Sequence, residues 1–124
     1  MAAKGTVLIV EDDEAFRTSL KTLFEREGFT TLEAGSGHEA VTLLGKEAVN
    51  LVILDYYLGD MTGLEFLGVT EGLSRVPVIV LTAFGDWGIY GDVIARGAVD
   101  CIAKPVKREA LMRVVKTALC VKQR

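Results

Sequence analysis

Cysteine is scarce in this chain, which contains only Cys101 and Cys120 among its 124 residues. The two cysteines stand nineteen positions apart and form no C-x-x-C pair. This spacing fits neither a zinc motif nor a redox pair. Because their neighbours are apolar, we expect two reduced cysteines packed in the core and no zinc site.

The chain also has a single histidine, His38, which stands at a predicted helix start. We interpret it as a solvated residue rather than a base, which excludes a Ser-His-Asp triad.

Long apolar runs are missing too, because the stretches 7–10 and 78–81 reach only four residues whereas a membrane span needs about 20. Residues 1–5 contain no apolar segment typical of a secretory signal, so the expected location is the cytoplasm.

An excess of positive charge is absent as well. The 14 basic and 17 acidic residues give a net charge of −3, which disfavours nucleic acid as a direct partner. What the chain does have is apolar content, with 50% hydrophobic residues and 25% charged ones. At this length a fold buries roughly two-thirds of the surface of the unfolded chain. We therefore expect one folded domain over residues 1–124, with a compact functional site.

Five short apolar segments alternate with helical patterns. The expected strands cover residues 6–10, 30–34, 51–54, 76–81 and 99–103. Apolar residues at helical spacing follow in 14–27, after Ser36, after Thr62, weakly in 85–96, and in 107–121. Such alternation is typical of right-handed strand–helix–strand units. The predicted class is α/β, with a five-stranded parallel sheet between two layers of helices.

Local signals mark three helix starts. Asp13 is placed to cap the first helix. Ser36 and Glu39 have the spacing of a capping box, and so do Thr62 and Glu65. These pairs predict helices that begin directly after Ser36 and Thr62.

Polar residues stand directly after the apolar strands. They are Glu11, Asp12, Asp55, Thr82 and Lys104. In a parallel sheet such positions share one edge, and ligands bind there. Each residue alone is more often a turn residue, a helix cap or a solvated side chain. Five of them on one predicted edge indicate a functional site.

Three carboxylates, from Glu11, Asp12 and Asp55, repel one another unless a cation neutralises them. Mg²⁺ prefers a few carboxylates, a carbonyl and several waters, and a main-chain oxygen in the loop after Asp55 completes such a set. With Lys104 and the Thr82 hydroxyl beside it, Asp55 is placed to act as a nucleophile toward a phosphoryl group. The pattern predicts a Mg²⁺-dependent aspartyl phosphate.

Four motifs carry a family resemblance. They are residues 7–13 (VLIVEDD), residues 51–55 (LVILD) with Gly63 eight residues later, residues 78–83 (VIVLTA), and Gly97-Ala98 leading to Lys104-Pro105. In this order and spacing they span nearly the whole chain and strongly resemble the receiver domain of two-component response regulators. The resemblance implies a flavodoxin-like (βα)5 fold with strand order 2-1-3-4-5.

The resemblance also implies roles for single residues. It makes Asp55 the acceptor of a phosphoryl group from a sensor histidine kinase or a phosphotransfer protein, and Thr82 and Lys104 the residues that bind the phosphoryl oxygens. The implied ligands of Mg²⁺ are Glu11, Asp12, Asp55 and the main-chain oxygen of Tyr57. The bond between Lys104 and Pro105 is expected to be cis. On this basis we expect a signalling domain rather than an enzyme.

The chain departs from the family pattern at several positions. Cys101 stands where the family usually has a tyrosine or phenylalanine whose rotamer reports phosphorylation, so we expect the signal to travel differently. Gly59 replaces a common proline, which leaves the loop after Asp55 less constrained. Tyr57 and Phe84 are bulky at two positions that influence access of the hydrolytic water. We therefore expect slow hydrolysis of the phosphoryl group.

The predicted helix in 85–96 is weak, because three glycines stand in its first seven residues and each costs about 1 kcal/mol relative to alanine. Trp87, Ile89 and Tyr90 offer more apolar surface than one core face absorbs. One interpretation is that these side chains pack inward. The other is that this helix, the strand 99–103 and the helix 107–121 form an output face for a partner or a second copy of the chain.

Three further functions deserve comparison. A phosphohydrolase of the haloacid-dehalogenase type expects a second aspartate at the position of Tyr57. A flavin-binding module needs a glycine-rich and hydroxyl-rich loop after the first strand, where residues 11–13 are acidic. The remaining alternative is a receiver-like interaction domain that is not phosphorylated. A stand-alone receiver and the N-terminal part of a longer regulator are both compatible with the sequence.

Overall fold

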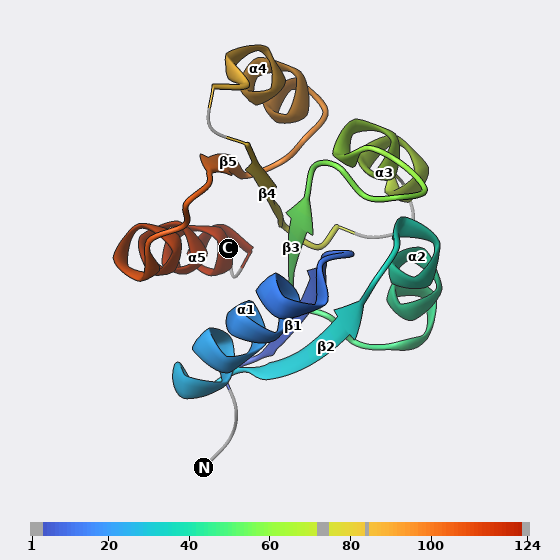
Figure 1. Ribbon diagram of the computed structural model, residues 1–124. Helices are drawn as coiled ribbons and strands as arrows, with labels where there is room; N and C mark the ends of the chain where they lie inside the picture. Colours follow the sequence, from blue (N-terminus) through green and yellow to red (C-terminus); the bar gives the residue numbers. More distant parts are fainter. Residues whose placement is uncertain (1–3, 72–74, 84, 123–124) are drawn as a thin grey trace.

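The computed structural model describes residues 4–71, 75–83 and 85–122, in which five strands alternate with five helices (Figure 1). The strands are β1 (Thr6–Val10), β2 (Thr30–Ala34), β3 (Leu51–Asp55), β4 (Val78–Thr82) and β5 (Asp100–Ala103). The helices are α1 (Glu14–Arg26), α2 (Gly37–Lys46), α3 (Gly63–Thr70), α4 (Trp87–Ala95) and α5 (Arg108–Lys122).

The strands form one parallel sheet in the order β2-β1-β3-β4-β5. The predicted class and strand order are therefore confirmed. In the register, Val10 pairs with Ala34 and with Leu54, and Asp55 pairs with Leu81. The central strands thus end at nearly the same level, so the residues that follow them meet at one edge of the sheet.

Alternate residues of the central strands face opposite sides of the sheet, as the two-residue period of a strand requires. Ile9 belongs to a core cluster with Phe24 of α1 and Leu111 of α5. Leu8 belongs to a second cluster with Phe66 of α3 and with residues of α2 and α4. Helices α1 and α5 consequently cover one face and α2, α3 and α4 the other (Figure 1). Because both faces are buried, β3 and β4 are apolar throughout until their last residues.

Two of the predicted helix caps are confirmed. The Asp13 side chain accepts a hydrogen bond from the Phe16 amide at the start of α1. Thr62 and Glu65 form a complete capping box at the start of α3, each accepting a hydrogen bond from the main-chain amide of the other.

The third cap differs from its prediction. The Ser36 side chain accepts a hydrogen bond from the Glu39 amide, as expected. The Glu39 carboxylate, however, accepts from the amide of Gly35 at 2.7 Å, one residue before the cap. The start of α2 is therefore held differently from a reciprocal capping box, and a further acceptor from the β3–α3 loop takes part.

Several element ends differ from their predicted positions. Strand β4 begins at Val78 rather than at residue 76, since Pro77 has no amide hydrogen to donate to a ladder. Strand β5 begins at Asp100. Helix α4 begins at Trp87, because Gly85 has a φ of 97°, in the left-handed region that ends helical geometry.

The two cysteines are free, but only one of them lies partly in the core. Cys101 is half-buried in β5, whereas Cys120 is exposed on α5, so the expectation of a core position is wrong for Cys120. Helix α5 buries Leu111, Val115 and Ala118 along one face, and Cys120 lies off that face. Across the part of the chain that the structure describes, no helix combines the length and the apolarity that a membrane crossing requires.

Candidate functional site

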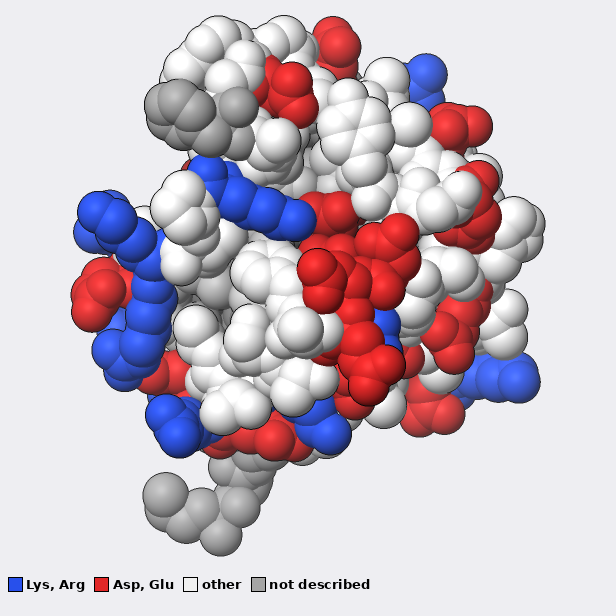
Figure 2. Space-filling model, in the orientation of Figure 1, with Lys and Arg blue, Asp and Glu red and all other residues white. Residues whose placement is uncertain are grey.

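The ends of β1 and β3 bring three carboxylates together. Oxygen atoms of Glu11, Asp12 and Asp55 all lie within 4.8 Å of one another. Glu11 and Asp55 are buried, while Asp12 is exposed to solvent. Figure 2 shows acidic side chains gathered near the middle of the visible face, with a basic side chain reaching their edge.

Lys104 follows β5 and reaches this cluster. Its Nζ lies 2.7 Å from Oδ1 of Asp55 and 3.4 Å from Oε1 of Glu11. The same atom lies 4.6 Å from the centre of the Phe16 ring, within the range of a cation–π contact. The peptide bond from Lys104 to Pro105 is cis. The ammonium group is thus held between two carboxylates and an aromatic face.

Burial sets the protonation behaviour of the site. It raises the pKa of Asp55, an effect that Lys104 opposes and the charge of Asp12 reinforces. Burial also raises the pKa of Glu11, against the hydrogen bond from the Asp13 amide. For Lys104 burial works toward a lower pKa, but Asp55 and Glu11 outweigh it and the pKa is raised. The lysine stays charged, whereas the two buried carboxylates are costly to ionise.

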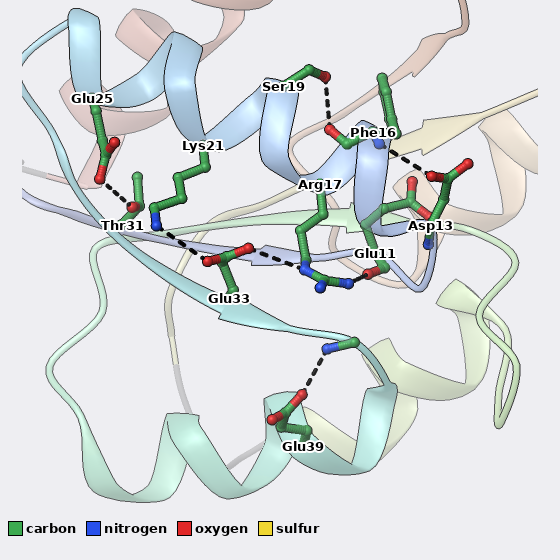
Figure 3. Close-up of polar contacts among 11 residues, drawn as sticks. Glu11, Asp13, Phe16, Arg17, Ser19, Lys21, Glu25, Thr31, Glu33 and Glu39 are labelled. Atoms are coloured by element: carbon green, nitrogen blue, oxygen red, sulfur yellow. Dashed lines mark hydrogen bonds and ion pairs between the residues drawn. The ribbon is translucent and has the colours of Figure 1, made fainter.

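The backbone at the end of β1 is fixed by a network that sequence reasoning missed (Figure 3). Nη1 of Arg17 donates to the main-chain oxygen of Glu11 at 2.7 Å, and Nε donates to Glu33 of β2 at 3.1 Å. The Asp13 amide donates to Oε2 of Glu11 at 3.0 Å. Helix α1 and strand β2 therefore hold the segment that carries the acidic residues.

Thr82, at the end of β4, is buried and contacts the start of α4. Its hydroxyl donates to Oδ2 of Asp86 at 3.4 Å. Asp86 is the N-cap of α4, yet its side chain makes no capping hydrogen bond to that helix. The main-chain oxygen of Thr82 accepts from the Lys104 amide at 2.8 Å. Thr82 is therefore linked to the site through Lys104 and to α4 through Asp86.

The loop after β3 runs beside the site. The main chain of Tyr57 works against burial and lowers the pKa of Asp55, and the Tyr57 ring is 57% exposed. A Cβ atom at Gly59 would lie 3.7 Å from Oδ2 of Asp12, so this backbone runs past the acidic cluster. Phe84, the second bulky residue of the sequence analysis, lies outside the described residues.

The donor set fits a hard divalent cation. It consists of three carboxylates and offers neither the thiolate nor the imidazole that zinc favours. With one ammonium group against three carboxylates, the fully ionised cluster carries a charge of about −2, which Mg²⁺ would neutralise.

A family model of the response regulator receiver domain matches residues 7–116. The chain belongs to this family. Membership disfavours the phosphohydrolase and flavin-binding alternatives, and it confirms the resemblance inferred from the sequence.

Similar proteins come from several bacteria. The chain is 32% identical over 117 residues to sporulation initiation phosphotransferase F of Bacillus subtilis, covering 94% of each chain. It is 36% identical over 113 residues to a CpxR homolog, a transcriptional regulatory protein of Haemophilus influenzae, covering 91% of this chain and 49% of that one. It covers 24% of the response regulator FleR of Pseudomonas aeruginosa. The chain thus spans nearly all of one relative and a quarter to a half of others.

Solved structures agree with this assignment. A CheY-like receiver domain from Methanospirillum hungatei has a TM-score of 0.89 at 29% identity, with 96% of each chain covered. The CheX–CheY–BeF3–Mg²⁺ complex of Borrelia burgdorferi has a TM-score of 0.85 at 28% identity, covering 93% of this chain and 89% of that one.

The candidate output face is partly open to solvent. The side chains of Trp87 and Tyr90 are 74% and 51% exposed, so the inward-packing interpretation is wrong for these two residues. Ile89 does pack against the cluster on the α2–α3–α4 side of the sheet. Cys101 packs against the same cluster from β5, so a small side chain occupies the place where the family pattern has an aromatic ring.

Proposed function

We propose that this receiver domain of a two-component signal transduction system works as a phosphoacceptor, and that Asp55 is the residue that accepts the phosphoryl group. Its membership of the receiver-domain family supports the proposal. The observation that carries this assignment is the buried Asp55 carboxylate, at the carboxyl edge of the sheet, 2.7 Å from the Lys104 ammonium group. No other aspartate among the described residues has its carboxylate bound by a lysine in this way.

In the proposed reaction a carboxylate oxygen of Asp55 attacks phosphorus, a P–O bond forms, and the bond from phosphorus to the histidine nitrogen of the donor breaks. Lys104 binds a phosphoryl oxygen, and its raised pKa keeps it charged for this task. The Thr82 hydroxyl leaves Asp86 to bind a second phosphoryl oxygen. The main chain of Tyr57 already favours the ionised form of Asp55, which the attack requires.

We further propose that the cofactor is Mg²⁺, held by Glu11, Asp12, Asp55 and the main-chain oxygen of Tyr57. Bound Mg²⁺ supplies positive charge against the developing negative charge of the phosphoryl group. Glu11 is fixed by the Asp13 amide and by Lys104. We infer that its carboxylate acts through a water molecule rather than directly.

Family membership indicates the kinds of partner protein, whereas the surface that contacts them is our proposal. Receiver domains interact with histidine kinases or phosphotransfer proteins. We propose that α4, β5 and α5 carry the output to a partner or to a second copy, because the Thr82–Asp86 contact joins the site to α4 and Trp87 and Tyr90 are exposed there. The cytoplasmic location and the single domain over residues 1–124 stay predictions. The alternative is a receiver-like interaction domain without phosphorylation.

Intact mass after incubation with acetyl phosphate tests the proposal. We expect a phosphoryl adduct on the parent protein in the presence of Mg²⁺, and none with a chelator or on Asp55→Asn. Asp13→Asn is the matched control, because Asp13 caps α1 and should leave the adduct unchanged. An adduct that persists on Asp55→Asn would refute the assignment of Asp55. Absence of any adduct on the parent, together with no Mg²⁺ binding, would favour the non-phosphorylated alternative.

A further inference from the structure

The loop between β3 and α3 carries the main-chain groups of Tyr57, so its conformation matters for the proposed site. It folds back on itself: the Leu58 amide donates to the Met61 main-chain oxygen at 3.1 Å, and the Gly63 amide donates to Tyr56 at 2.6 Å. The loop contains Gly59 and no proline, so no ring restricts its backbone. Something else must restrict this loop if it is to hold one geometry.

Asp60, at the tip of the loop, is bound to the start of α2. Its Oδ1 accepts from the Gly37 amide at 2.9 Å, and its Oδ2 accepts from the His38 amide at 2.9 Å. Oδ2 also lies 2.7 Å from Nδ1 of the His38 ring. Both carboxylate oxygens thus satisfy amides that a helix start leaves unpaired. The two amides and the His38 ring hold the pKa of Asp60 well below its usual range, so the carboxylate is ionised throughout the neutral range.

The neighbouring residue reinforces this attachment. Met61 packs so closely on Gly37 that a Cβ atom there would overlap the Met61 sulfur. The loop and the first turn of α2 are therefore in contact through a charged pair of hydrogen bonds and through close packing. Twenty-two or twenty-three residues separate the two sides in the sequence.

We propose that Asp60 is a positioning residue, which ties the β3–α3 loop to α2 and thereby sets the main-chain groups of Tyr57 for Mg²⁺ binding. This inference rests on the proposed function. The attachment restrains the loop from outside rather than within its own backbone. Asp60 itself is not placed among the metal ligands, and its side chain is occupied by α2.

A purely structural role, as a cap of α2, makes a different prediction. Ser36 caps the same helix through the Glu39 amide but does not belong to the β3–α3 loop. Loss of either cap weakens α2, whereas only loss of Asp60 releases the loop. Ser36→Ala is therefore the matched control for Asp60→Ala, and urea unfolding of both variants places their losses of stability on one scale.

The experiment measures Mg²⁺ binding to the unphosphorylated full chain by titration calorimetry. Mutation of residues that hold metal ligands in place typically lowers metal affinity by 10–100-fold. We therefore expect the Mg²⁺ dissociation constant of Asp60→Ala to rise by roughly tenfold. Ser36→Ala should bind Mg²⁺ like the parent. Amide hydrogen exchange should quicken at Leu58 and Gly63 in Asp60→Ala and not in Ser36→Ala.

Asp60→Asn separates position from charge, because asparagine keeps one side-chain oxygen as an acceptor without the negative charge. We expect its Mg²⁺ affinity to lie closer to that of the parent than to that of Asp60→Ala. Equal losses of Mg²⁺ affinity in the two Asp60 variants would show a simple charge effect and overturn the inference. Equal losses of Mg²⁺ affinity in Asp60→Ala and Ser36→Ala would overturn it as well.

The role of Asp60 and the proposed function can fail separately. If the parent gains a phosphoryl group at Asp55 and Asp60→Ala binds Mg²⁺ normally, only the role of Asp60 is refuted. Parent protein that binds no Mg²⁺ would refute the metal site and this inference together.

Discussion

At the residue scale, the buried Asp55 carboxylate sets a conflict between stability and function. Burial raises its pKa above the value of about 3.9 that it has in the unfolded chain. Ionisation therefore costs folding free energy, and this cost is absent below pH 3.9, grows as the pH rises toward the folded-state pKa, and is complete above it. The charge that the proposed reaction needs is thus one that weakens the fold.

We predict that Asp55→Asn is more stable than the parent at pH 7 in the absence of Mg²⁺, by an amount of order 1 kcal/mol. The substitution removes a costly charge and its repulsion from Asp12, and Lys104 keeps Glu11 as its partner at 3.4 Å. Urea unfolding at pH 7 and at pH 3 measures the difference, which should vanish at the lower pH.

The control is Asp13→Ala, which removes a carboxylate that caps α1. It should lower stability by about 1 kcal/mol, so the substitutions at Asp55 and Asp13 differ in the sign of their effect. A parent that is more stable than Asp55→Asn at pH 7 would show that the contact with Lys104 outweighs burial.

A second residue-scale prediction concerns the lifetime of the phosphoryl group. Tyr57 lies two residues beyond Asp55 and its ring is 57% exposed, so we expect a smaller side chain there to give water easier access to Asp55. We predict that Tyr57→Asn loses its phosphoryl group several-fold faster than the parent. The decay of the adduct, followed by intact mass after removal of acetyl phosphate, measures this rate. Tyr90→Asn, an exposed tyrosine of α4, should decay like the parent, and equal decay of all three proteins would contradict the prediction.

At the element scale, α4 is the helix with the least support from its own sequence. Gly88 and Gly91 lie inside it, and a Cβ atom at either position would meet nothing within 4 Å. Gly97 follows its end with a φ of 105°, and a Cβ atom there would also meet nothing. The glycines thus differ in backbone conformation while the space around them is alike.

We predict opposite effects of the same substitution at two of these positions. Gly91→Ala should stabilise α4 by up to about 1 kcal/mol, because alanine restricts the unfolded chain and favours the helix. Gly97→Ala should destabilise the protein by about 1 kcal/mol, because the left-handed conformation is strained for alanine. Thermal unfolding together with hydrogen exchange of the α4 amides measures both. A Gly91→Ala variant with unchanged α4 exchange would show that tertiary contacts, and not glycine content, limit this helix.

The elements themselves were predictable because their signals are local. Apolar runs of β-branched residues mark β1, β3 and β4, and the spacing of apolar residues marks α1 and α5. The ends of strands and helices were predicted less well where a single residue determines the boundary. Examples are Pro77 before β4 and the left-handed Gly85 before α4. The predicted hydrogen bond from the Ser36 amide to the Glu39 carboxylate was wrong, because the Gly35 amide donates instead. The two amides are adjacent, and only the path of the chain decides between them.

At the scale of the whole molecule, the site depends on which strand ends are neighbours. Placing polar residues after strands required only the sequence, but bringing Asp12 beside Asp55 required β1 to pair with β3, and that order came from the family resemblance. Contacts such as those of Arg17 with Glu33 and of Asp60 with α2 join segments whose sequences carry no pairing signal. Their residue types are common on solvated helices and loops, so nothing local distinguishes them.

The same arrangement links Mg²⁺ to the stability of the whole fold. Glu11, Asp12 and Asp55 come together only in the folded chain, so an ion held by them stabilises the folded state by mass action. We predict that the free energy of unfolding rises with Mg²⁺, by about 2.7 kcal/mol at 100 times the dissociation constant. Urea unfolding over a Mg²⁺ series, with NaCl at matched ionic strength, separates this effect from screening of the net charge.

Acid should abolish this stabilisation earlier than an ordinary carboxylate site would allow. Ion binding requires ionised ligands and therefore releases protons from them. Since burial raises the pKa of both Glu11 and Asp55, protons compete with Mg²⁺ already at a pH above the usual carboxyl range. The Mg²⁺-dependent part of the stability should fall away as the pH drops through that region and should be nearly absent in Asp12→Asn, while Asp13→Asn retains it. An increase in stability that is equal in Asp12→Asn and the parent would place the ion elsewhere on the molecule.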